Sequence, residues 1–288
     1  MKNTTIISIL LVSIAFISCK KKESPNAIPE TATLLFSSGF AGDVYIDETV
    51  VEDNLDYKYI RGTDSETGYS WPITVLGATE SGLHYVDDDD FKAVESEIQT
   101  VIGHNGTPTK ALFVKENYNT ESTQLPYEIL NIKEGKKDLY IKFWIKLDSA
   151  SLFAPNMWRT FFEWKSMDYG KGGGFRLISY IYTDADGVPY WHWQGDRKPN
   201  KPKWEIDNKT IPVPINEWFK TEFYWHWSEG DDGRALWRIN DQVVGDHYGP
   251  TAHRGKPVDF IMLGQIYGSQ NPKHQWIDDI EIWNSLPD

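Results

Sequence analysis

The residues best suited to chemistry lie in two short segments, 175–183 and 190–194, on either side of the tetrapeptide 184–187 (Asp-Ala-Asp-Gly). That tetrapeptide is typical of a turn, so the two segments are predicted to form an antiparallel hairpin. Alternate side chains of a strand point to opposite faces, which gathers polar and aromatic groups on one face. The predicted face carries Arg176, Tyr180, Tyr182, Tyr190, His192 and Gln194. With the turn centred near Asp186, Tyr180 is expected beside His192 and Tyr182 beside Tyr190.

This set of groups meets the needs of β-elimination at a 4-linked uronic acid. The reaction needs groups that neutralise the C6 carboxylate, a base that takes the C5 proton and an acid that protonates the leaving oxygen. Arg176 and Gln194 are assigned to the carboxylate, His192 to the base and Tyr180 to the acid. Tyr182 and Tyr190 are expected to contact the sugar. The same face also suits a sugar-binding cleft without turnover, because aromatic and polar side chains line both kinds of site.

A basic loop follows the hairpin. The segment 197–203 (Arg-Lys-Pro-Asn-Lys-Pro-Lys) contains four cations and no acidic residue. In a chain that is acidic overall, such a loop indicates an anionic ligand, and an exposed loop stiffened by proline is the alternative. The cations expected to hold sulfate or carboxylate groups are Arg197, Lys198, Lys201 and Lys203.

Two further sets of residues offer other chemistry. His226 shares a strand face with Tyr224 and is a candidate for substrate contact, with a hydrogen-bonded core position as the alternative. Glu163 and Glu205 each stand beside a tryptophan and are the leading pair for a glycoside hydrolase, although their spacing carries no hydrolase pattern.

The predicted elimination requires no cofactor. Asp87–Asp90 and the pair Asp278 and Asp279 offer hard oxygen ligands for a structural calcium ion. An exposed acidic turn and a turn cap are the alternatives for these two acidic groups, so the sequence leaves the metal open.

The composition places these groups in a folded domain that is rich in aromatic residues. The 288 residues include 42 acidic and 29 basic side chains, and the net charge of −13 argues against nucleic acid as a partner. The 13 Trp, 15 Tyr and 13 Phe indicate either a sandwich core of large rings or a surface for flat ligands such as sugars. A single cysteine excludes a disulfide scaffold.

Short alternating runs predict strands through most of residues 34–288. Apolar residues occupy every second position of the segment 139–147, namely Leu139, Ile141, Phe143, Ile145 and Leu147. Further strands are predicted at 219–227, 235–240, 260–266 and 276–283, and one short helix at 89–101. Residues 34–288 are therefore interpreted as one all-β domain of two packed antiparallel sheets, expected to be a monomer.

The first 33 residues predict export and attachment to a membrane. Lys2 precedes the apolar run Ile6–Ile17, which is typical of a secretory signal. Residues 16–19 (Phe-Ile-Ser-Cys) resemble a lipobox, so Cys19 is the predicted lipidation site after removal of residues 1–18. An ordinary signal peptide with an incidental cysteine is the alternative. Residues 19–33 are polar and suit a tether, and the predicted location is the cell envelope, as an outer-membrane lipoprotein.

Several of these segments resemble concanavalin-like jelly-roll proteins of bacterial polysaccharide utilisation. The resemblance rests on 139–147 (LYIKFWIKL), 216–222 (NEWFKTE), 237–244 (WRINDQVV) and 276–283 (WIDDIEIW). Among these families, the alginate-, heparin- and ulvan-lyase types are similar in placing Gln and His two residues apart, as His192 and Gln194 stand here in reversed order. The resemblance implies cleavage of an anionic polysaccharide such as ulvan or alginate.

The same resemblance implies a catalytic tyrosine on a late strand, and Tyr267 matches it. Tyr267 is therefore a second candidate for the acid. Leu263 stands where these enzymes carry a lysine, so the cation is expected from Lys203 or Arg176. Lectins, hydrolases and lyases share the scaffold, so a glycan-binding lipoprotein and a glycoside hydrolase stay open as alternatives.

Overall fold

The computed structural model describes residues 31–47, 50–52, 55–73, 81–85, 94–116, 127–149, 154–166, 169–170, 172–199, 201–255, 257–262 and 273–287. Its strands belong to one compact unit, Ala32–Asp288. The predicted signal peptide and the lipidation site Cys19 lie outside these residues. Over the described ranges, no helix has the length and apolar character needed to cross a membrane.

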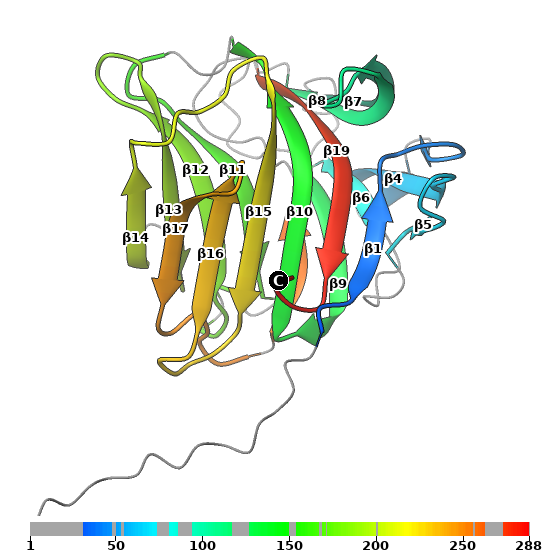
Figure 1. The fold of residues 1–288 in the computed structure, drawn as a ribbon. Helices are drawn as coiled ribbons and strands as arrows, with labels where there is room; N and C mark the ends of the chain where they lie inside the picture. Colours follow the sequence, from blue (N-terminus) through cyan, green and yellow to red (C-terminus); the bar gives the residue numbers. More distant parts are fainter. Residues whose placement is uncertain are drawn as a thin grey trace, which may run out of the picture. The chain divides into compact units, whose positions relative to one another are not determined.

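Two antiparallel sheets make up the domain. Sheet I contains β1 (Leu34–Ser38), β7 (Val94–Ile102), β8 (Pro108–Glu116), β10 (Asp138–Leu147), β15 (Trp218–His226), β16 (Arg234–Ile239), β17 (Gln242–Tyr248) and β19 (Lys273–Trp283). Its order is β17-β16-β15-β10-β19-β8-β7, and β1 pairs with β19. This sheet is in front in Figure 1.

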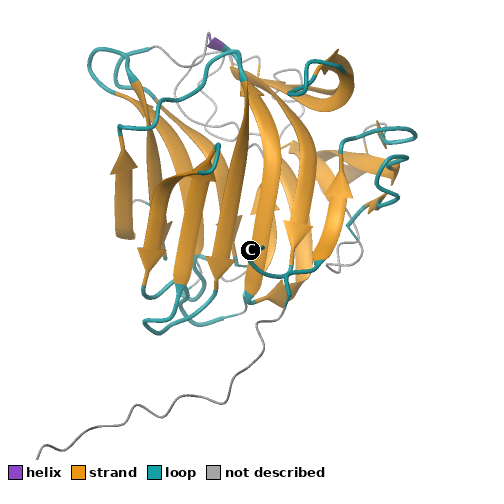
Figure 2. Cartoon of the chain, viewed as in Figure 1, coloured by secondary structure: helices purple, strands orange, loops and turns teal. Residues whose placement is uncertain are grey.

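Sheet II lies behind sheet I in the same view. It contains β2 (Tyr45–Ile46), β3 (Val50–Glu52), β4 (Leu55–Thr63), β5 (Ser70–Trp71), β6 (Ser81–Tyr85), β9 (Tyr127–Lys136), β11 (Trp158–Lys165), β12 (Arg176–Thr183), β13 (Pro189–Asp196), β14 (Pro202–Asn208) and β18 (Val258–Met262). Its order is β14-β13-β12-β11-β18-β9-β6-β4-β2, with β3 and β5 beside β4. Strands dominate the described residues (Figure 2), and the predicted all-β jelly roll of two packed antiparallel sheets is confirmed.

Large rings fill the space between the sheets. The alternation predicted for β10 is present, because its five apolar side chains are fully buried. Phe162 of β11 stacks on Phe223 of β15 with ring centroids 4.0 Å apart, and Trp164 stacks on Trp225 at 5.7 Å. Burial of each such ring contributes about 1.5–3 kcal/mol. Much of the tryptophan content therefore serves the core and joins sheet I to sheet II.

One predicted element is wrong. Residues 94–102 form strand β7 and not part of a helix, since they pair with β8 along their whole length, from Val94 opposite Glu116 to Ile102 opposite Pro108. The turn between the strands is closed by a hydrogen bond from the Gly103 N–H to the Thr107 carbonyl, 2.8 Å long. Cross-strand pairing satisfies the backbone groups that a helix would otherwise satisfy internally.

Candidate active site

The hairpin of β12 and β13 has the register predicted from its turn. Tyr180 lies opposite His192, and Tyr182 lies opposite Tyr190. Asp184 fixes the turn, because its Oδ1 accepts hydrogen bonds from the backbone N–H groups of Asp186 and Val188, both 2.9 Å long. Leu177, Ile181, Trp191 and Trp193 face the core. The alternate residues consequently lie on the outer face of sheet II.

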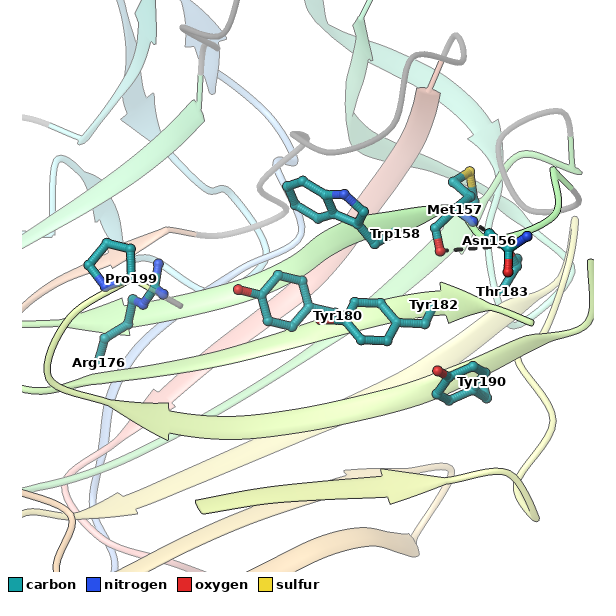
Figure 3. A pocket seen from close by; sticks show the side chains of 9 residues that line it. All are labelled: Asn156, Met157, Trp158, Arg176, Tyr180, Tyr182, Thr183, Tyr190 and Pro199. Carbon is teal, nitrogen blue, oxygen red and sulfur yellow. Dashed lines mark hydrogen bonds between the residues drawn. The ribbon is translucent and has the colours of Figure 1, made fainter. Parts of the chain in front are cut away.

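An open pocket of about 680 Å³ lies on this outer face (Figure 3). Its lining is mainly aromatic, and Arg176 is the one charged side chain among the described lining residues. Those residues are Asn156, Met157, Trp158, Arg176, Tyr180, Tyr182, Thr183, Tyr190 and Pro199. The predicted face of the hairpin therefore forms the floor of a real cavity.

His192 lies beside the pocket tyrosines and is hydrogen bonded through both ring nitrogens. Its ring stacks on Tyr182, with centroids 4.7 Å apart. Nδ1 lies 2.6 Å from Asp207 Oδ1, and Nε2 lies 3.0 Å from Gln194 Oε1. Both partners are acceptors, so the ring donates to Asp207 from Nδ1 or to Gln194 from Nε2, according to the nitrogen that carries the proton.

Asp196 anchors the polar groups at the other end of the hairpin. Its buried carboxylate accepts hydrogen bonds from Tyr169 Oη at 2.5 Å, Arg176 Nη2 at 2.6 Å and Gln194 Nε2 at 2.9 Å. The bond from Gln194 fixes the orientation of that amide and points its oxygen at His192. Arg176 and Gln194 are thus brought together as predicted, but they already share a protein carboxylate.

Glu163 adds a second carboxylate beneath Arg176. It is fully buried, with Lys165 Nζ 2.8 Å and Arg176 Nη1 3.6 Å from its Oε1. The positive charges of Lys165 and Arg176 therefore balance the negative charges of Glu163 and Asp196 at this end of the site. A buried, ion-paired Glu163 is poorly placed to act on a glycosidic bond, so the geometry gives the glycoside hydrolase alternative no support.

Burial controls the protonation of the pocket phenols. Burial raises the pKa of Tyr180, while the Arg176 cation acts in the opposite direction. Burial together with Tyr190, Glu205 and Asp207 raises the pKa of Tyr182 to about 12. Both phenols therefore keep their protons at neutral pH and can act as hydrogen-bond donors or acids.

Solved structures of polysaccharide lyases share this architecture. The fold is similar to that of alginate lyase Aly36B. The similarity has a TM-score of 0.52 at 15% sequence identity and covers 81% of this chain and 95% of that chain. A variant of Aly36B in complex with alginate tetrasaccharide gives a TM-score of 0.50 at 16% identity, over 69% of this chain and 89% of that chain.

A lower TM-score, 0.49, is found for an endo-β-1,4-glucuronan lyase from the fungus Trichoderma reesei, at 14% identity over 65% of this chain and 87% of that chain. No protein-family model and no curated protein matches the sequence. At such identities the likeness establishes the fold and not the activity, which depends on the residues of the site.

The basic loop borders the pocket, but its cations do not line it. Pro199 is a lining residue, whereas the side chains of Lys198, Lys201 and Lys203 are exposed. Lys203 shares the outward face of β14 with Glu205 and Asp207, so the strand that follows the loop places acidic side chains beside its cations. Glu205 and Asp207 make this rim of the pocket more acidic than the basic loop alone predicts.

His226 does not join the site. It lies on β15 of sheet I, where Phe223 and Trp225 point into the core and His226 points outward. Its Nδ1 lies 2.8 Å from Asp138 Oδ1. The structure therefore does not bring His226 together with the hairpin residues, because its strand belongs to the opposite sheet.

Two predicted features cannot be placed. Tyr267 and Asp87–Asp90 lie outside the described residues. Asp278 and Asp279 are described, and the N–H of Asp279 donates to Asp278 Oδ1 at 2.8 Å. Within the described parts of the chain, no cluster of three or more His, Cys, Asp or Glu side chains is arranged to hold a metal ion.

Sequence reasoning missed four residues of the site, namely Trp158, Tyr169, Asp196 and Asp207. Asp196 could have been predicted from the sequence, because it continues the alternation of His192 and Gln194 by one more step. The position of Asp207 opposite His192 depends on the pairing of β14 with β13. The register of that pairing shifts between Gly195 and Asp196, and the alternation of residues in the sequence does not predict this shift. Tyr169 reaches the site from a loop, for which the sequence carries no signal.

Proposed function

We propose that this protein is a polysaccharide lyase that cleaves a uronic-acid-containing polysaccharide by β-elimination. The observation that carries the proposal is the pocket on sheet II, where Arg176, Tyr180 and Tyr182 line the surface and His192 lies against the tyrosines. The similarity in fold to an alginate lyase gives independent support.

The proposed reaction begins at His192. Asp207 holds the proton on Nδ1, so Nε2 is the nitrogen that accepts the C5 proton of the uronate. Nε2 faces Gln194 Oε1, and a ring acting as base must lose that contact. A turn of the Gln194 amide toward the substrate would free Nε2 and present an N–H to the C6 carboxylate, next to the Arg176 guanidinium.

Tyr180 completes the elimination as the acid. The electrons of the C5–H bond form the C4–C5 double bond, and the C4–O4 bond breaks with its electrons on oxygen. The phenol of Tyr180 then donates its proton to that oxygen, which leaves a new hydroxyl end and an unsaturated uronate. Burial keeps this phenol protonated until the leaving oxygen develops charge.

A pair of matched variants tests the assignment. Purified protein is incubated with alginate, glucuronan, ulvan and heparin, and the ultraviolet absorbance of the unsaturated product is followed. Tyr180→Phe is expected to lower the rate by about 10² or more, because it removes the acid. Tyr224→Phe makes the same change on sheet I, where the phenol donates to Asp138, and should keep the activity. Failure of the unaltered protein on every acidic polymer would defeat the proposal.

The runner-up is a cell-surface protein that binds an anionic glycan without cleaving it. It is favoured by the pairing of Arg176 and Gln194 with Asp196, since that pairing satisfies both groups before any substrate arrives. Retardation of the protein in gels containing a polymer, with no unsaturated product, would select this function.

The proposed setting is the cell envelope. Lipidation at Cys19 would tether residues 34–288 to the outer membrane, with the anionic polysaccharide as partner. Metabolic labelling with a palmitate analogue tests this, because Cys19→Ser should abolish the incorporation of label.

A further inference from the structure

The pocket is longer than one sugar ring, and its two ends differ chemically. Arg176 and Tyr182 are six residues apart on β12, which separates them by about 20 Å along the strand. Figure 3 shows Arg176 and Pro199 at one end, Tyr180 in the middle, and Tyr190 with Asn156 at the other end, and Trp158 is paired with Tyr182 of that other end. Neighbouring sugars of a polymer would therefore meet different surroundings.

The end remote from Arg176 offers only uncharged side chains among the described lining residues. Trp158 is 42% exposed and presents its ring to the pocket, with its plane at 72° to that of Tyr180 and the centroids 6.0 Å apart. The other members of this group, called here the aromatic end, are Asn156, Met157, Tyr182, Thr183 and Tyr190. Such surfaces bind the apolar faces of sugar rings and have no cation for an acidic substituent.

The phenols along the pocket differ in the charged groups that shift their pKa values. Beyond burial, the strongest charge acting on Tyr180 is the Arg176 cation, which lowers its pKa. The carboxylates of Asp207 and Asp184 instead raise the pKa of Tyr190, after burial. Lys209 packs on the Tyr190 ring, with Nζ 4.5 Å from its centroid, but it is not a lining residue.

The pKa of Tyr182 is shifted by the same kinds of group as that of Tyr190. Its pKa is raised by burial first, and the carboxylates of Glu205 and Asp207 also contribute. Both carboxylates are about half exposed, so they act on the pocket from its rim. A negatively charged sugar at the aromatic end would be repelled, because like charges brought together without pairing are unfavourable.

We infer that the substrate alternates uronic acids with uncharged sugars, the acid binding at the Arg176 end and its uncharged neighbour at the aromatic end. This inference rests on the proposed lyase function and narrows its substrate class. A polymer made wholly of uronic acids would place a second carboxylate against Trp158, Tyr182 and Tyr190, where no described lining residue neutralises it.

Steady-state kinetics on two classes of polymer test the inference. Heparosan and deacylated gellan present a 4-linked uronate next to an uncharged sugar, whereas alginate and glucuronan consist of uronates alone. The expected kcat/KM is at least about tenfold higher on the alternating polymers, the size of a like-charge penalty. Equal or faster cleavage of alginate and glucuronan would overturn the inference and leave the lyase function standing.

A result without turnover is also decisive. If no polymer is cleaved, the lyase function fails, and retardation in gels containing the same four polymers then decides the binding preference. Retardation by heparosan or gellan alone supports the aromatic end as a site for an uncharged ring. Retardation by alginate or glucuronan alone, or equal retardation by both classes, overturns it.

A cation placed in the aromatic end should reverse the preference. Trp158→Lys is expected to lower kcat/KM on heparosan and to raise it on alginate, each by about tenfold. Val188→Lys adds the same charge at an exposed position of the hairpin turn outside the lining, and should change neither. Tyr190→Lys serves as the second test if Trp158→Lys does not fold. An unchanged preference in a folded variant contradicts the inference.

Discussion

Asp196 and Asp207 each hold a different part of the same hydrogen-bonded chain. Asp196 binds Arg176 and Gln194, Gln194 binds His192, and His192 binds Asp207. Because Asp196 is buried with its partners, it acts mainly on the structure of the site, and removing a buried charge partner typically costs about 3–5 kcal/mol. Asp207 is about half exposed and contacts one nitrogen of a single ring, that of His192.

At the scale of single residues, Asp207 and Glu205 form a matched pair. They lie two residues apart on the outward face of β14 and are 51% and 53% exposed. Asp207→Asn is expected to lower kcat by about 10² with little change in KM, because Nδ1 of His192 loses its carboxylate partner. Glu205→Gln should leave kcat nearly unchanged, because Glu205 Oε1 lies 3.6 Å from Nε2 of His192, beyond hydrogen-bond distance. Equal losses in both variants would show that only the charge of the rim matters.

At the scale of elements, the hairpin β12–β13 is the part of the site that the sequence predicts best. A four-residue turn and strict alternation fix both the register and the face, and the structure confirms the pairs Tyr180–His192 and Tyr182–Tyr190. The remainder depends on contacts with segments that are not continuous with the hairpin. Asp207 arrives on β14 past an irregularity in pairing, and Tyr169 arrives on a loop.

The turn of this hairpin gives a test at the same scale. Asp184→Ala removes an acceptor from two backbone N–H groups and is expected to destabilise the protein by about 1 kcal/mol. It should also raise KM, because Tyr182 and Tyr190 lie directly beside the turn. Asp186→Ala changes an exposed side chain of the same turn and should do neither. Urea unfolding and substrate titration measure the two effects, and an identical response of both variants would exclude the role given to Asp184.

At the scale of the whole molecule, the two sheets share a core, and the pocket lies on the outer face of sheet II. Phe162 on Phe223 and Trp164 on Trp225 lock sheet II to sheet I, which gives the pocket a rigid floor. The sequence predicts the strands of both sheets from alternation, but it does not assign β15 to either sheet, so His226 stayed a separate candidate for substrate contact.

The stability of the domain should depend on pH through Asp278. Burial and the neighbouring Asp279 raise the pKa of Asp278 to about 7 from 3.8. The folded state therefore binds more protons than the unfolded state between these values, and this contribution to stability falls as pH rises from about 4 to 7, at about 1.4 kcal/mol per unit of pKa difference. In urea unfolding, Asp278→Asn should gain stability relative to the unaltered protein across that range, and Asp186→Asn should not. If the free energy of unfolding depended on pH in the same way in all three proteins, the raised pKa of Asp278 would be contradicted.

Mass spectrometry of the products from heparosan distinguishes elimination from hydrolysis and from binding alone. Elimination at the sheet II pocket predicts fragments that each begin with an unsaturated uronate, one water lighter than the products of hydrolysis, and predicts that Tyr180→Phe forms almost none. Saturated fragments would identify a hydrolase. Intact polymer after incubation with heparosan and with every other acidic glycan, despite binding, would identify a glycan-binding protein. Either result would contradict β-elimination at the sheet II pocket.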